Sequence, residues 1–104
     1  MKEVKAFVHR NRVADVLRAL KSAGYCCISI VDVKGMLEAL DPKEREFSLE
    51  LGAEMITEVK LELVCEDEEL DQAVALIREN ARTGQATAGW ICVNDLSAVY
   101  PIDG

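Results

Sequence analysis

The sequence has little basic charge and therefore little affinity for polyanions. Twelve Lys and Arg residues stand against nineteen Asp and Glu residues, so the formal net charge is −7. Nonspecific nucleic-acid binding and anionic membrane surfaces both need a basic surplus, and we expect neither partner. The longest uncharged runs are too short to cross a bilayer, and the opening residues lack the apolar core of a secretory signal. We expect a cytoplasmic protein without direct membrane insertion.

Motifs that carry catalysis are also missing. The chain contains no G-x-S-x-G, no P-loop and no H-E-x-x-H sequence. Its one histidine, His9, ends a predicted strand and has no neighbouring motif that would make it a general base. We therefore predict no catalytic residue and no enzymatic activity.

The four cysteines lack the spacing of a metal or redox motif. They are Cys26, Cys27, Cys65 and Cys92, and no C-x-x-C occurs. Neighbouring residues of a strand point to opposite faces, so the adjacent pair is predicted to be poorly placed to share a metal or a disulfide. We expect reduced thiols that mostly pack as apolar residues, and no metal site. The alternative is a redox switch that uses one exposed member of the Cys26/Cys27 pair.

Hydrophobic spacing predicts two similar halves joined by a long segment. In the first half we expect a strand over 2–9, a helix over about 11–24 and a strand over 25–33. In the second we expect a strand over 59–65, a helix from 66 that ends near Gly84, and a strand over 90–93, with a short further strand over 98–102. Right-handed crossovers then place both helices on one face of an antiparallel four-stranded sheet. This is a single α+β domain with the ferredoxin-like order βαββαβ.

The other face of this sheet would have no helix to cover it. Apolar residues such as Phe7, Cys27 and Val31, or their neighbours of opposite parity, would lie there. Association with further copies of the chain is the simplest way to remove that face from water. We therefore expect an oligomer.

Two connecting segments are candidates for binding. The segment over about 36–55 is long for so small a domain, and it is either a solvated acidic excursion or a docking element for a partner. The residues that would make that contact are Glu38, Asp41, Lys43, Arg45, Phe47 and Glu54. The small-residue segment over 82–90 is either an ordinary connection or a cluster of backbone N–H groups able to receive an anion.

Four stretches of the chain together resemble the PII nitrogen-regulatory signalling proteins. They are Val33-Lys34-Gly35, Leu51-Gly52-Ala53-Glu54-Met55, Val59-Lys60-Leu61-Glu62-Leu63-Val64, and Ala81-Arg82-Thr83-Gly84 with Gly89 and Ile91. The resemblance covers nearly the whole chain, with the elements in the same order. It implies a homotrimer that binds ATP or ADP in clefts between subunits. It also implies that the long loop, called the T-loop, engages a transporter, enzyme or regulator.

The resemblance implies a nucleotide site that keeps its base-and-ribose half. Ser29 replaces a threonine that meets the adenine, and Gly35 is the loop-entry glycine. The predicted nucleotide-binding residues are Ser29, Gly35, Met36, Glu62, Val64, Thr83, Gly84, Gly89 and Trp90.

The phosphate half of that site lacks the family's cations. At the positions of Glu38, Trp90, Pro101 and Asp103 the family usually has basic residues, and Glu58 replaces the lysine that helps hold 2-oxoglutarate. Each charge-assisted hydrogen bond contributes about 1.5–3 kcal/mol, so losing three weakens triphosphate binding on the order of a thousandfold or more. We expect no required cofactor, and AMP, ADP or an unrelated small ligand as the effector.

The long loop also departs from the family. Glu50 and Met55 replace the tyrosines at the ends of the uridylylation motif, so tyrosine uridylylation is not available there. The sequence predicts a non-enzymatic PII-like regulator that acts on a transporter or enzyme through this loop. The alternative is a trimeric module of the same fold that binds no nucleotide and has a metal-tolerance or structural role.

Overall fold

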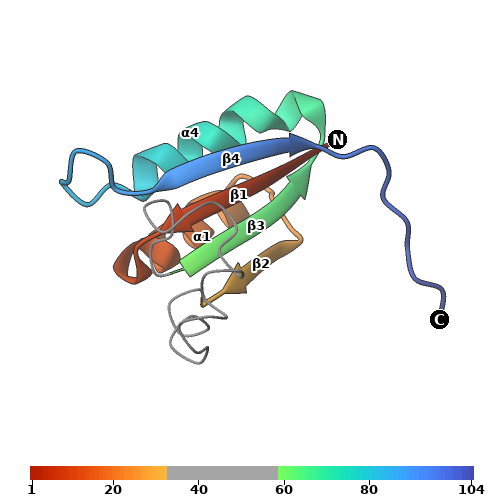
Figure 1. Ribbon diagram of the computed structural model, residues 1–104, viewed down its shortest axis with the longest axis horizontal. Helices are drawn as coiled ribbons and strands as arrows, with labels where there is room; N and C mark the ends of the chain where they lie inside the picture. Colours follow the sequence, from red (N-terminus) through yellow and green to blue (C-terminus); the bar gives the residue numbers. More distant parts are fainter. Residues whose placement is uncertain (33–58) are drawn as a thin grey trace, which may run out of the picture.

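The computed structural model describes residues 1–32 and 59–104, which form an α+β fold of two layers (Figure 1). In chain order the elements are β1 (Lys2–Val8), η1 (Arg10–Arg12), α1 (Val13–Ser22), β2 (Ile28–Val31), β3 (Val59–Cys65), η3 (Asp67–Glu69), α4 (Leu70–Asn80) and β4 (Trp90–Asp95). The strands lie in the order β2-β3-β1-β4, and every neighbouring pair is antiparallel. The predicted ferredoxin-like architecture is confirmed.

Both helices pack on one face of the sheet, as the alternating strand pattern predicts. Val4, Ala6 and Val8 of β1 alternate toward the helices and are at most 2% exposed. They meet Leu61 and Leu63 of β3, and the helices contribute Val16, Leu20, Ala73 and Ile77 to the same core. Burial of these apolar side chains is the main force that holds the helices to the sheet.

The face without helices is more polar than predicted. Phe7 lies there beside Trp90 and is 1% exposed, but its neighbours on the same face include Lys5, Lys60 and Glu62. The Lys60 ammonium lies 3.0 Å from the Glu62 carboxylate. Cys27 does not belong to this face, because it precedes β2.

Four predicted elements differ from the structure, among them the second helix, since α4 begins at Leu70 after a turn of 3-10 helix and ends at Asn80. The first helix spans 13–22 and follows a turn of 3-10 helix, although Gly24 ends it with φ +92° as its position predicts. The second strand begins at Ile28 and not at 25, because Cys27 has φ +58° and interrupts the extended backbone. Residues 98–102 form no strand; Tyr100 and Ile102 are 82% and 99% exposed, and the tail runs away from the domain (Figure 1).

Side-chain hydrogen bonds join segments that are distant in sequence. The Arg12 Nε–H donates to the Asn80 carbonyl oxygen at 2.9 Å, so the start of α1 satisfies an open carbonyl at the end of α4. The Tyr25 hydroxyl donates to the Glu69 carbonyl oxygen at 2.5 Å and lies 3.2 Å from Gln72 Oε1. The loop after α1 is thereby tied to the start of α4.

We expect Tyr25→Phe to lower the free energy of unfolding by about 1 kcal/mol, because it removes the hydroxyl that donates to Glu69. Urea unfolding measures the change. Tyr100→Phe is the matched control, since Tyr100 is 82% exposed and its hydroxyl should contribute nothing. Equal stabilities of the two variants would contradict the role given to the Tyr25 hydroxyl.

The same tyrosine makes stability depend on alkaline pH. Burial, with the nearby Cys65 and Glu69, raises the pKa of Tyr25 above its ordinary value of 10.0. A raised pKa in the folded state contributes stability below the unfolded pKa, and that stability is lost as pH rises toward the folded value. Wild type should therefore lose stability above about pH 10 more steeply than Tyr25→Phe.

Candidate functional site

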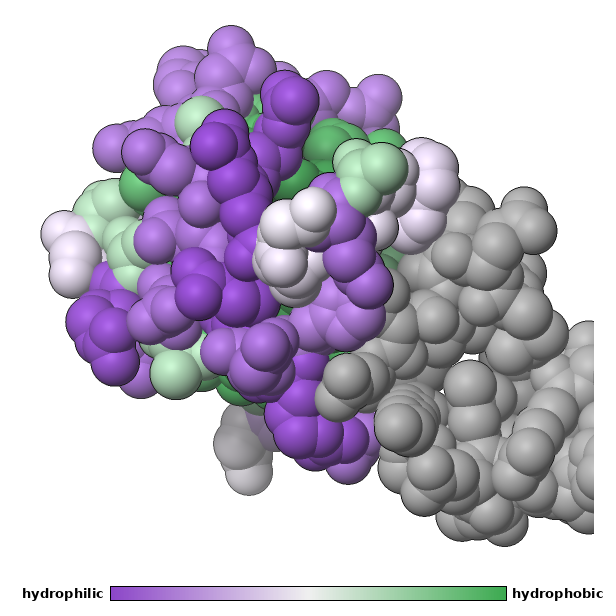
Figure 2. All heavy atoms as spheres, turned by 90° about the vertical axis from the view of Figure 1, so that its left-hand side faces the viewer, coloured by the Kyte–Doolittle hydropathy of each residue, from purple (hydrophilic) through white to green (hydrophobic). Residues whose placement is uncertain are grey.

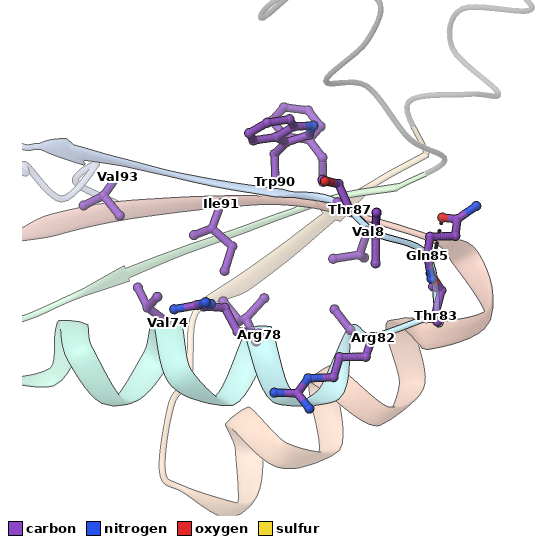
Figure 3. Close-up of a pocket in the computed structure, with 17 residues that line it drawn as sticks. Val8, Val74, Arg78, Arg82, Thr83, Gln85, Thr87, Trp90, Ile91 and Val93 are labelled. Atoms are coloured by element: carbon purple, nitrogen blue, oxygen red, sulfur yellow. Dashed lines mark hydrogen bonds between the residues drawn. The ribbon is translucent and has the colours of Figure 1, made fainter.

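The 82–89 loop forms a groove together with the last turns of α4 and the start of β4 (Figure 3). The groove has a volume of about 640 Å³, within the range of small-molecule sites. The polar side chains that line it are Arg78, Arg82, Thr83, Gln85 and Thr87. Figure 2 views the end of the molecule that carries this loop, where hydrophilic side chains dominate and apolar ones are recessed between them.

Glycine shapes this loop at two points, for different reasons. Gly84 has φ +90° with open space around it, so it is needed for its backbone conformation. A Cβ on Gly89 would overlap the carbonyl oxygen of Phe7 and lie 3.3 Å from the carbonyl carbon. Gly89 therefore allows the loop to pass directly against β1, and its demonstrated role is close packing of two backbones.

Hydrogen bonds hold the loop in place. The Thr83 hydroxyl lies 3.2 Å from Gln85 Oε1 and accepts from the Gln85 backbone N–H at 3.4 Å. His9 Nε2 lies 3.0 Å from the same Gln85 oxygen. The residue after β1 thus contacts the loop through its side chain, and His9 helps to position the loop.

Two arginines line the groove, although neither was among the binding residues predicted from sequence. Both side chains are exposed; Arg78 lies near the end of α4, and Arg82 follows that helix, which ends at Asn80. Arg78 extends from α4 toward β4, and Arg82 lies along the end of the helix (Figure 3). Within residues 1–32 and 59–104 neither guanidinium has an ion pair or hydrogen-bond partner. Their spacing beside a small-residue loop was the signal that could have found them.

The predicted base-side residues lie together at the other edge of the sheet. Ser29 of β2 is the direct cross-strand partner of Glu62 of β3. Val64 is on the same face two residues further along β3 and is 38% exposed. The structure therefore brings Ser29, Glu62 and Val64 together on the face without helices.

The other predicted residues within the described ranges lie away from that group. β2 and β4 are the two edge strands, about 14 Å apart at three strand spacings. Trp90 begins β4 and points to the helix-free face, away from Arg78 and Arg82 (Figure 3). Thr83 and Gly84 lie in the loop beyond α4. Gly35, Met36 and the six residues predicted to contact a partner lie outside the described residues.

The sequence that folds in this way matches a family of known proteins. The family model described as "Nitrogen regulatory protein P-II" matches residues 1–103. The chain belongs to the P-II family. Proteins of this family are regulatory signal transducers that form trimers, bind nucleotide effectors and act on target proteins.

Individual relatives are similar over almost the whole chain. "Nitrogen regulatory protein P-II 1" of Methanothermobacter thermautotrophicus is 32% identical over 102 residues, which are 98% of this chain and 89% of the relative. "Nitrogen regulatory protein P-II" of Rhodobacter capsulatus is 31% identical, and that of Pasteurella multocida is 29% identical, each with 98% of this chain and 91% of the relative covered. In the described ranges, no helix is long and apolar enough to cross a membrane.

One buried cysteine agrees with the sequence prediction, and the adjacent pair does not. Cys65 is 5% exposed and packs in the core, as expected of an apolar thiol. Cys26 and Cys27 are both exposed, and their sulfurs lie 3.6 Å apart. The prediction that the pair points to opposite faces is wrong, because neither residue belongs to a strand and Cys27 has a left-handed backbone.

Proposed function

We propose that this chain is the subunit of a homotrimeric P-II-type regulator that binds AMP or ADP between subunits. The observation that carries the proposal is the division of the candidate residues between the two edges of the sheet. One copy would supply the base-side residues Ser29, Glu62 and Val64. Its neighbour would supply the groove of the 82–89 loop, where a phosphate would lie.

The electrostatics of the groove support a ligand with few phosphates. Arg78 and Arg82 offer two guanidinium groups beside the N–H groups of a small-residue loop, and guanidinium forks suit phosphate oxygens. Pro101 and Asp103 stand where P-II proteins usually carry basic residues. Two cations match one or two phosphates better than a triphosphate.

The segment over about 36–55 would transmit the bound state to a transporter or enzyme. The effector must bind one arrangement of this segment more tightly than another, because only differential affinity shifts a conformational equilibrium. Its acidic residues, among them Glu38, Asp41 and Glu54, suit a basic surface on the target. The regulator would be one domain over 1–104 and would require no cofactor.

A thermal-shift panel tests the identity of the effector. AMP, ADP, ATP with and without 2-oxoglutarate, and divalent metals are each added to the trimer. Stabilisation follows the ratio of ligand concentration to dissociation constant, about 2.7 kcal/mol at one hundred times Kd. We expect AMP or ADP to stabilise most. Tight ATP binding that depends on 2-oxoglutarate would contradict the proposal, and a response to metals alone would favour the non-nucleotide module.

Two serine variants, one in the proposed site and one control, test the base side of the site. Ser29→Ala removes one hydroxyl beside Glu62 and should weaken nucleotide binding about tenfold, measured by the fluorescence of the single tryptophan, Trp90. Ser22→Ala is the control, since Ser22 is exposed at the end of α1. Unchanged affinity in Ser29→Ala would remove Ser29 from the site.

A further inference from the structure

Cys26 and Cys27 form a surface dithiol whose geometry is unusual for neighbouring residues. In extended backbone the two side chains would point to opposite sides. Here Cys27 has φ +58°, a conformation that residues with a Cβ rarely adopt outside strained or functional sites. The result is a Sγ–Sγ distance of 3.6 Å with both residues exposed.

Packing does not account for this arrangement. Neither cysteine belongs to the hydrophobic core, whereas Tyr25 and Ile28 on either side of the pair contact it. The two thiols border a hollow of about 510 Å³, which is also lined by Leu17, Lys21 and Ile30. A solvent-facing pair in a disfavoured conformation therefore needs another explanation.

The sulfur separation matches one ligand geometry better than others. A disulfide needs sulfurs about 2.05 Å apart and Cα atoms usually about 4.4–6.8 Å apart, whereas neighbouring Cα atoms stand only about 3.8 Å apart. Two thiolates on a tetrahedral ion, at about 2.3 Å each, lie roughly 3.8 Å apart. Linear coordination at the same bond length would separate them by roughly 4.6 Å. The observed 3.6 Å is close to the tetrahedral value.

We propose that Cys26 and Cys27 together bind one soft, tetrahedrally coordinating metal ion of the zinc and cadmium class. Each thiol loses its proton to solvent, each sulfur forms a bond to the ion, and two water ligands leave the ion. In the described ranges no group of three or more His, Cys, Asp or Glu residues gathers around a possible metal position. The site is therefore open, with water in the remaining positions, and the fold does not depend on the ion.

Only the thiolate form of cysteine binds a metal ion, so binding releases a proton from each thiol and the apparent affinity should rise with pH. This site does not depend on the proposed nucleotide site, and binding is measured without nucleotide.

Titration of the reduced full chain with Cd²⁺ tests the proposal, with the ultraviolet thiolate-to-metal band as the readout. We expect one ion per chain. Cys26→Ser and Cys27→Ser should each weaken binding on the order of a hundredfold, because one thiol alone loses the advantage of the linked second donor. Cys92→Ser is the control and should bind as wild type does, because Cys92 lies on β4.

Cys27→Gly distinguishes a loss of metal binding from a loss of folding. Glycine adopts a left-handed backbone freely, so this variant should melt at the wild-type temperature or higher and still lose the metal band. Undiminished binding in Cys26→Ser or Cys27→Gly would overturn the proposal. Loss of binding in Cys92→Ser, or fewer than one ion per chain with the ion bridging copies, would also overturn it.

Discussion

Gly89→Ala should lower the free energy of unfolding by about 2–3 kcal/mol, near the upper end of the cost of overpacking a filled site. The added Cβ overlaps the carbonyl oxygen of Phe7, which lies near the end of β1, an inner strand paired on both sides, and cannot move without disturbing the sheet. Because the loop would be pushed away from β1, the 82–89 groove should also widen. Urea unfolding measures the loss of stability.

Gly84→Ala is the matched control for this prediction. It lies in the same loop, and a Cβ there meets nothing within 4 Å, so its cost comes only from φ +90°. That cost is about 1 kcal/mol. A smaller effect at Gly89 than at Gly84 would show that the loop moves freely, and Gly89 would then not be a packing position.

Replacing both arginines of the groove should abolish most of the affinity for a nucleoside phosphate. In the double variant Arg78→Ala and Arg82→Ala, AMP and ADP lose two charge-assisted contacts of at least about 1.5 kcal/mol each. Together these correspond to roughly a hundredfold or more in Kd. Isothermal titration calorimetry measures the change. Adenosine, which has no phosphate, should keep its wild-type affinity.

A third arginine supplies the charge-matched control. Arg18 is exposed on α1, bonds Asp15 at 3.1 Å and does not line the groove. Arg18→Ala should therefore leave AMP binding unchanged. Equal losses for adenosine and AMP in the double variant would mean that the arginines support the loop and do not contact phosphate. An equal loss of AMP affinity in Arg18→Ala would mean that Arg78 and Arg82 act through the net charge of the protein and not through contacts in the groove.

The strands of this fold were the easiest elements to predict, because their side chains alternate. The pattern Val59, Leu61, Leu63, Cys65 matches β3 residue for residue, and all four side chains are buried. Prediction failed where one backbone angle overrode propensity. Tyr25, Cys26 and Cys27 have strand-like neighbours, but the left-handed Cys27 shortens β2 and brings the two thiols together. No periodicity in the sequence indicates such an angle.

The candidate site, like the fold, could be predicted from the sequence only in part. The residues Ser29, Glu62 and Thr83 could be selected through the family resemblance, but the pairing of Ser29 with Glu62 at one side of the sheet, away from the loop that carries Thr83, depends on the strand order β2-β3-β1-β4. No motif in the sequence indicates that Arg78 and Arg82 line a site. Their position on the groove depends on how α4 packs beside β4 and on the path of the 82–89 loop.

The amino-acid sequence by itself indicated the family through four short stretches that resemble it, and it determined the order of strands and helices along the chain and the acidic character, because order and character depend on local periodicity and composition. Only the tertiary structure decided which side chains share a surface. Neighbourhood across strands and loops depends on pairing register and on single backbone angles such as that of Cys27. These arise from packing between segments distant in the chain, and no local pattern records them.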